Sequence, residues 1–251
     1  MNRLDAAFAK PGKKLVIYAT SRDGDSAAVF RAAAAGGADV IEVGVPFSDP
    51  TADGPAIQAA SVRALAAGGG VGSALEDART VRAAHSELGI ILFGYLNPFL
   101  QHGDAASAAA GAAVDGILCV DLPPEEDDEL GPALRSHGLH SIRLIAPTST
   151  DVRIAAAAKS GGGFLYVVSV TGVTGGKMGK AADLSHLVAR VRKKTKLPIV
   201  IGFGISTPDD AVRLAEHADG VVVGSAVVRL AAERGASEVE RFVSSIRRAL
   251  R

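Results

Sequence analysis

Two acidic residues stand where a carboxyl group could transfer a proton. Glu42 lies inside the apolar segment Val40–Val45, and Asp53 follows it in a loop rich in proline and glycine. An apolar environment raises the pKa of a carboxyl group toward the range in which it works as both acid and base near neutral pH. Because side chains alternate along a strand, Glu42 shares one face with Val40 and Gly44. This arrangement predicts acid/base chemistry on a small substrate.

Both acids also have a structural interpretation. A glutamate embedded among Val and Ile must reach the solvent, pair with a cation such as arginine, or hold a proton. An aspartate among prolines and glycines often bonds to its own backbone in a turn. For Asp49 we prefer this turn interpretation. For Asp53 the turn interpretation and a catalytic role are equally well supported. The residues by themselves leave these alternatives open.

Three glycine-containing segments follow late apolar runs and could bind a phosphate group. Glycine turns and helix N-termini present bare backbone N–H groups to an anion. Beside one of them, Thr207 is the expected N-cap and Pro208 the expected first residue of a helix. One such turn is weak evidence, but three together indicate a phosphate site. The segments are Thr171–Lys177, Gly202–Gly204 and Gly224–Ser225.

Short apolar runs must position these residues, and each is followed by a longer stretch with helical periodicity. About eight such alternations in one chain predict a closed (β/α)8 TIM barrel, because parallel strands need helical crossovers. A doubly wound open sheet is the competing fold. The strands are expected at Leu15–Thr20, Val40–Val45, Ile90–Tyr95, Gly116–Val120, Ser141–Ile145, Gly163–Val168, Ile199–Gly202 and Gly220–Val223.

Two of the expected connections are unusually long. They follow the second and sixth strands, at about residues 46–70 and 169–182. In such a barrel the connections that leave the strand ends build the active-site face, so these two loops should carry functional residues. Nothing divides the sequence into parts, so residues 1–251 are expected to form a single domain.

The composition excludes several classes of protein. The chain has 251 residues, of which 48% are hydrophobic, and its 27 basic and 27 acidic residues give no net charge. Neutrality argues against nucleic acid or an anionic membrane as a partner. One cysteine and six histidines without ligand spacing predict no metal site and a reducing compartment. The N-terminus has charges where an export signal would be apolar, and no apolar run could span a membrane, so a cytoplasmic location is expected.

At these residues the sequence resembles the tryptophan synthase alpha subunit family along nearly its whole length. The most specific motif is the block from Glu42 to Pro55, which reads Glu-x-Gly-x-Pro-Phe-Ser-Asp-Pro-x-Ala-Asp-Gly-Pro. Three further motifs are Ser169–Gly175, Gly202–Ile205 and Gly224–Ser225. The resemblance implies a TIM barrel that cleaves indole-3-glycerol phosphate into indole and glyceraldehyde 3-phosphate. It also implies no cofactor in this chain and a pyridoxal-phosphate beta subunit as partner in an alpha2beta2 complex.

The resemblance also assigns roles to individual residues. It implies that Glu42 is the acid/base that transfers protons and that Asp53 is the second catalytic carboxylate. Tyr166 matches a tyrosine beside the indole. The matching phosphate-binding positions are Gly175, Gly204, Gly224 and Ser225. The matching pocket and loop positions are Tyr18, Ile57, Thr174 and Phe203.

Two other functions share these motifs. One is a free-standing indole-3-glycerol-phosphate lyase that releases indole without a partner. The other is a non-catalytic barrel that only binds and activates a pyridoxal-phosphate enzyme, although the presence of both Glu42 and Asp53 argues against it.

The segment Thr20–Asp25 departs from the family's usual Gly-Asp-Pro turn, which leaves the local loop geometry open. Asp121–Pro123 also matches the family, and we expect it at the subunit interface.

Overall fold

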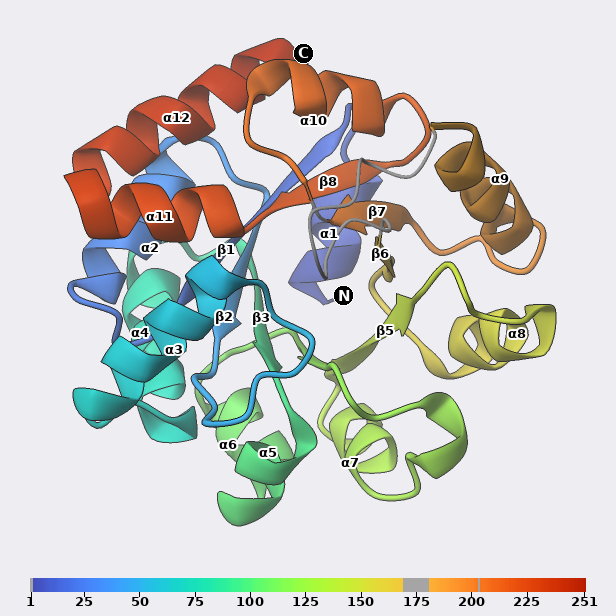
Figure 1. The fold of residues 1–251 in the computed structure, drawn as a ribbon. Helices are drawn as coiled ribbons and strands as arrows, with labels where there is room; N and C mark the ends of the chain where they lie inside the picture. The colour runs from blue at the N-terminus through green and yellow to red at the C-terminus, as the bar shows by residue number, and fades with distance from the viewer. Residues whose placement is uncertain (1, 169–180, 203) are drawn as a thin grey trace.

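Eight parallel strands close into a barrel in which each strand pairs with its neighbours in chain order and β8 pairs with β1 (Figure 1). The computed structural model describes residues 2–168, 181–202 and 204–251. The strands are runs of buried, mostly β-branched residues, which suit a sheet covered on both faces. They are β1 (Lys14–Thr20), β2 (Val40–Gly44), β3 (Gly89–Gly94), β4 (Gly116–Cys119), β5 (His140–Ile145), β6 (Leu165–Val168), β7 (Ile199–Gly202) and β8 (Gly220–Val223).

Helices surround this barrel on the outside, and α1 lies across one of its ends. They are α1 (Arg3–Ala9), α2 (Ser26–Ala35), α3 (Pro55–Ala66), α4 (Val71–Ala84), α5 (Leu96–Gln101), α6 (Ala105–Gly111), α7 (Leu130–Ser136), α8 (Asp151–Ser160), α9 (Ala181–Arg192), α10 (Pro208–Ala215), α11 (Ser225–Arg234) and α12 (Ala236–Ala249), with a 3-10 turn at Pro124–Glu126.

The predicted TIM barrel is therefore confirmed, and the open sheet is excluded. Each predicted strand overlaps an observed one. The sixth strand begins at Leu165 rather than at Gly163, because Gly163 has a φ of 70°, which an extended strand does not adopt. The helix after β7 begins at Pro208, with Thr207 capping it as expected.

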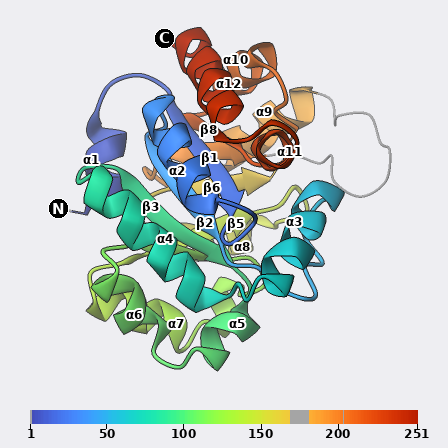
Figure 2. The same cartoon turned by 90° about the vertical axis from the view of Figure 1, so that its left-hand side faces the viewer.

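Alternation along the strands divides the core into two layers. Val16 on β1 points into the barrel and packs with side chains such as Val40 and Ile91, whereas Ile17 points outward to the helices. Leu4 of α1 belongs to the inner layer and is fully buried, so α1 closes the amino-terminal end of the barrel. Figure 2 shows α1 at one end of the barrel and α3 at the opposite end. The carboxyl ends of the strands consequently open on the α3 side.

Three aspartates repeat one contact at the amino-terminal end. Asp39, Asp115 and Asp219 each stand directly before a strand and accept a hydrogen bond from the backbone of the neighbouring strand, at 2.8, 2.9 and 2.7 Å. Each is also paired with an arginine, namely Arg247, Arg82 and Arg192 respectively. The sequences Gly37–Val40, Val114–Ile117 and Ala218–Val221 resemble one another, and the shared aspartate has the same role in each. It ties the start of its strand to the neighbouring strand.

Candidate active site

Glu42 lies on the inner face of β2, with Tyr18 of β1 and Ile91 of β3 beside it in the register of the sheet. The side chain is fully buried, and neither carboxyl oxygen has a hydrogen-bond partner among the described residues. Burial raises the pKa of Glu42 to about 8. The structural interpretation, a glutamate paired with an arginine, finds no such pair in the described part of the chain. Glu42 therefore holds a proton near neutral pH and can release it.

Asp53 lies in the connection between β2 and α3. Its backbone N–H donates to Pro50 O at 3.1 Å, and its own carbonyl accepts from the Gln58 side chain at 2.8 Å. Its carboxylate accepts a hydrogen bond from the hydroxyl of Tyr95 at 3.0 Å. Burial raises the pKa of Asp53 to about 6, and the Tyr95 hydrogen bond opposes that rise. Asp53 is thus ionised at neutral pH, and no described contact ties its carboxylate to its own backbone.

The two carboxyl groups line one cavity of about 330 Å³ at the carboxyl end of the barrel. Its inner wall is apolar or aromatic and includes Ile57, Phe93 and Tyr166. Its other wall comes from the starts of the connections after β7 and β8. Of the residues singled out in the sequence, the cavity brings together Tyr18, Glu42, Asp53, Ile57, Tyr166, Gly204, Gly224 and Ser225. Thr174, Gly175 and Phe203 lie outside the described residues.

Tyr18 and Tyr166 fit inside the barrel because glycine stands opposite each ring. A Cβ at Gly44 would collide with the ring and hydroxyl of Tyr18, and one at Gly202 would collide with those of Tyr166. Burial first, and then the carboxyl groups of Glu42 and Asp53, raise the pKa of Tyr166. Both tyrosines are therefore neutral phenols that shape the cavity.

The wall formed after β7 and β8 offers backbone N–H groups. Gly224 precedes α11, and no side chain caps that helix, so its first N–H groups face the cavity without a described partner. By contrast, Thr207 and Asp210 form a capping box that occupies the first N–H groups of α10. Gly204 has a φ of 78°, a conformation that favours glycine. The N-terminus of α11 therefore has the geometry that an anion site requires.

Three residues of the site were not singled out from the sequence, namely Phe93, which lines the cavity, Tyr95 and Arg229. Tyr95 directly follows β3 and is buried, with its ring 5.2 Å from that of Phe47. Its hydroxyl donates to Asp53 and accepts from Ala52 N–H, so it fixes the loop that carries Asp53. Arg229 is exposed on α11 and is the only cationic side chain among the described residues that line the cavity. Its spacing of four residues from Ser225 places it one helical turn further along, a signal available from the sequence.

We predict that Tyr95→Phe raises the pKa of Asp53 further, by about one unit, because the lost hydrogen bond stabilised the ionised form. The ring and its contact with Phe47 are retained in this variant. Carbon-13 NMR titration of the Asp53 carboxyl group measures the shift. An unchanged titration midpoint would show that Tyr95 does not act on this carboxylate.

The unusual turn after β1 is held by polar contacts rather than by a Gly-Asp-Pro sequence. The hydroxyls of Ser21 and Ser26 both donate to the carboxylate of Asp77 at 2.7 Å. Asp23 forms a bidentate pair with Arg63 of α3 at 2.7 and 2.8 Å. The turn is thereby joined to the helix that follows the Asp53 loop, and the departure from the family pattern leaves the cavity intact.

Within residues 2–168, 181–202 and 204–251, no group of three His, Cys, Asp or Glu side chains is arranged to hold a metal ion. In the same residues, no helix combines the length and the apolar character needed to cross a bilayer.

Comparison with known proteins finds relatives along nearly the whole chain. The family model described as tryptophan synthase alpha chain matches residues 4–249. The tryptophan synthase alpha chain of Erythrobacter litoralis is 48% identical over 237 residues, which cover 94% of this chain and 92% of the relative. That of Geobacter sulfurreducens is 48% identical over 264 residues, covering 100% and 99%.

Solved structures agree with these relatives. Tryptophan synthase subunit alpha from Legionella pneumophila str. Paris has a TM-score of 0.91 at 37% identity, covering 100% of this chain and 98% of that one. A chain of tryptophan synthase from M. tuberculosis, in its aminoacrylate-bound form, has a TM-score of 0.90 at 32% identity and covers both chains completely.

Proposed function

The chain belongs to the tryptophan synthase alpha chain family, and from that premise we propose that it is a carbon–carbon lyase that splits indole-3-glycerol phosphate into indole and glyceraldehyde 3-phosphate. The observation that carries the proposal is the single cavity that joins a buried, protonated Glu42, an ionised Asp53 and the open N-terminus of α11. Such a cavity suits a substrate with an aromatic ring at one end and a phosphate at the other.

Glu42 performs the proton transfers of this retro-aldol reaction. As an acid it protonates C3 of the indole, which leaves a positive indolenine. As the resulting carboxylate it takes the proton from the hydroxyl on the carbon attached to C3. The carbon–carbon bond then breaks, its electrons neutralise the ring, and the hydroxyl carbon becomes the aldehyde. Glu42 ends the cycle protonated again, and a pKa of about 8 suits both tasks near neutral pH.

Asp53 stabilises the charge that this sequence creates. Protonation at C3 gives the indole N–H positive character, and an ionised carboxylate facing it lowers the energy of that state. A fixed charge in a partly buried site is effective because little solvent screens it. Tyr95 holds Asp53 in position and favours its ionised form.

The substrate's two ends match the two walls of the cavity. Phe93, Ile57 and the tyrosines contact the indole, and the N–H groups at Gly224 and Ser225 bind the phosphate. Gly175 extends this phosphate site and Thr174 and Phe203 the pocket, as the family resemblance implies. Arg229 adds a positive charge beside two acids, which a doubly charged phosphate needs.

We predict a bell-shaped pH dependence of kcat. Activity requires Asp53 ionised and Glu42 protonated, so it falls below a pH of about 6 and above a pH of about 8. Steady-state rates measured from pH 5 to pH 9 with saturating substrate test this. A rate that keeps rising between pH 8 and pH 9 would contradict Glu42 as the acid.

The partner in this proposal is a tryptophan synthase beta subunit, which carries pyridoxal phosphate and receives the indole in an alpha2beta2 complex. The steps assigned to Glu42 and Asp53 are proton transfer and charge stabilisation, for which this chain needs no cofactor. Val62 and Leu65 are exposed on α3 beside the Asp53 loop, and they provide an apolar surface next to the site. The Asp121–Pro123 segment remains a candidate for the same interface. The chain acts as one barrel domain over residues 1–251 in the cytoplasm.

Turnover measured alone and with a cognate beta subunit separates this proposal from its alternatives. We expect slow release of glyceraldehyde 3-phosphate by the isolated chain and strong stimulation by the beta subunit. Equal turnover in both conditions would indicate a free-standing lyase that releases indole. No cleavage in either condition, together with activation of the beta reaction, would indicate a non-catalytic barrel.

A further inference from the structure

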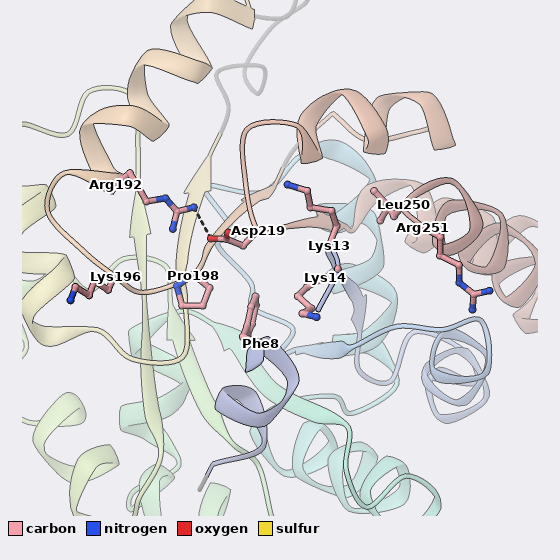
Figure 3. A pocket seen from close by; sticks show the side chains of 10 residues that line it. Phe8, Lys13, Lys14, Arg192, Lys196, Pro198, Asp219, Leu250 and Arg251 are labelled. Carbon is pink, nitrogen blue, oxygen red and sulfur yellow. Dashed lines mark hydrogen bonds and ion pairs between the residues drawn. The ribbon is translucent and has the colours of Figure 1, made fainter. Parts of the chain in front are cut away.

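A second cavity lies at the amino-terminal end of the barrel, opposite the candidate active site. Its volume is about 620 Å³, and its walls come from segments that are far apart in the sequence. Figure 3 shows Phe8 of α1 projecting into it between the strand starts. The Phe8 ring contacts that of Phe164 at 5.4 Å, so the floor of the cavity is continuous with the inner core. The lining side chains other than glycine are Phe8, Lys13, Lys14, Arg192, Lys196, Pro198, Asp219, Leu250 and Arg251.

The side chains around this cavity are strongly biased toward positive charge. Five of the lining residues are lysine or arginine, whereas Asp219 is the only acid among them. The carboxylate of Asp219 is already engaged, because it accepts from Arg192 and from the backbone of Ile199, both at 2.7 Å. The chain as a whole has no net charge. The cavity therefore concentrates positive charge that the rest of the molecule does not share.

Lys14 differs from the other cations because it is buried. It belongs to β1, its side chain faces the inside of the barrel end, and the residue is only 3% exposed. Its ammonium group donates to Lys10 O at 2.6 Å and to Pro11 O at 3.1 Å, and no carboxylate pairs with it among the described residues. The nearby Asp39 is paired instead with Arg247 at 3.1 Å. Buried lysines are usually paired with a carboxylate, but among the described residues Lys14 makes no direct ion pair, and Asp39 acts on it only from a distance.

The other cations are placed to assist Lys14. Lys13 is anchored by a hydrogen bond from its ammonium group to Ala218 O at 2.7 Å. Lys196 is exposed at the rim and has no ion-pair partner in the described part of the chain. The negative ends of the helices gather on this face and favour basic residues there, which explains Arg192 in the last turn of α9. Lys14 also contacts such a helix end, because Lys10 is the C-cap residue of α1, but it does so from inside the barrel end.

We propose that this cavity binds a small anion that carries at least two negative charges on phosphate or carboxylate groups. The ammonium groups of Lys13 and Lys14 are preorganised by backbone carbonyls, so binding needs little reordering of those side chains. Phe8, Pro198 and Leu250 give an apolar surface for a carbon skeleton attached to the anionic groups. The site lies outside the proposed catalytic machinery and does not depend on it.

Isothermal titration calorimetry with pyrophosphate tests the proposal, at an ionic strength of about 0.15 M where surface attraction is largely screened. We expect saturable binding that weakens roughly tenfold or more in Lys14→Met, because a charge-assisted contact is lost. Lys196→Gln should weaken binding several-fold. Lys159→Gln removes the same charge from an exposed position outside the cavity and should leave binding unchanged.

A further variant separates this site from the catalytic cavity. Ser225→Asp places a negative charge at the N-terminus of α11 and should leave this binding event intact. Loss of binding in Ser225→Asp with retention in Lys14→Met and Lys196→Gln would overturn the proposal, as would the absence of saturable binding to the wild-type chain. If circular dichroism shows that Lys14→Met does not fold, Lys13→Gln and Lys196→Gln replace it. Weaker pyrophosphate binding in both would support the proposal, and unchanged binding in both would overturn it.

Discussion

Replacing Glu42 by glutamine should reduce kcat by a factor of roughly 10²–10⁴, the usual contribution of a positioned acid/base. The amide has the size of the protonated acid but neither gives a proton to C3 nor accepts one from the hydroxyl. Because Glu42 makes no hydrogen bond to a described residue, the exchange breaks no such contact. We expect the dissociation constant of indole-3-glycerol phosphate to change less than threefold. Single-turnover cleavage and equilibrium binding measure the two quantities separately.

Stability provides an independent check on the same variant. The pKa of Glu42 in the folded chain is about 8, against a usual value of 4.5, so the folded state keeps a proton that the unfolded chain releases. The contribution of Glu42 to the stability of the wild type is therefore fully present below pH 4.5 and is lost as the pH rises to about 8, a change of a few kcal/mol. Glutamine does not ionise, so Glu42→Gln should be the more stable chain at pH 8. Thermal unfolding at pH 5 and pH 8 measures this.

Glu87→Gln is the matched control, because Glu87 is exposed and outside the cavity. It should change neither turnover nor the pH dependence of stability. A Glu42→Gln variant with wild-type turnover would remove Glu42 from the mechanism. One that is less stable at pH 8 than the wild type would contradict the raised pKa.

Asp53→Asn should lower kcat by a factor of about 10²–10³, because a preorganised charge facing the developing positive charge is lost. The amide still accepts the hydrogen bond from Tyr95, so the loop should keep its position. The phosphate end of the cavity is formed by other residues, and the dissociation constant for glycerol 3-phosphate should stay within about threefold. This separation of turnover from binding distinguishes a catalytic charge from a structural turn residue.

The neighbouring Asp49 supplies the control for this second variant. It is exposed in the same loop, and Asp49→Asn should leave turnover unchanged. The dissociation constant for glycerol 3-phosphate and kcat are measured for both variants. An Asp53→Asn chain altered only in its affinity for the phosphate would assign Asp53 to binding rather than to catalysis.

Much of the fold was predictable because it depends on local patterns. Runs such as Ile199–Gly202 and Gly220–Val223 are both apolar and short, and they are strands at those residues. Alternation correctly placed Glu42 on the same face as Val40. Strand starts were less certain, since Gly163 reads as part of an apolar run but has a left-handed backbone. The helix after β7 followed from its cap and its proline.

The contacts within the candidate site were harder to predict, because residues distant in sequence make them. Tyr95 and Asp53 are 42 positions apart, and only the closure of the barrel brings the hydroxyl to the carboxylate. The counter-ion of Glu42 could not be excluded from the sequence, because any of the 27 basic residues was a candidate. The cavity around Lys14 gives no sequence signal, since its walls come from both ends of the chain. The roles of the individual site residues stay predictions for the variants above.

The most direct test of the proposed activity is the release of glyceraldehyde 3-phosphate from indole-3-glycerol phosphate, measured with saturating substrate and the beta subunit present. Wild type and Glu42→Gln are compared in the same assay. The assignment predicts release by the wild type and a loss of at least about a hundredfold in the variant. Undiminished release by Glu42→Gln, or no release by a folded wild-type chain that binds the substrate, would contradict it.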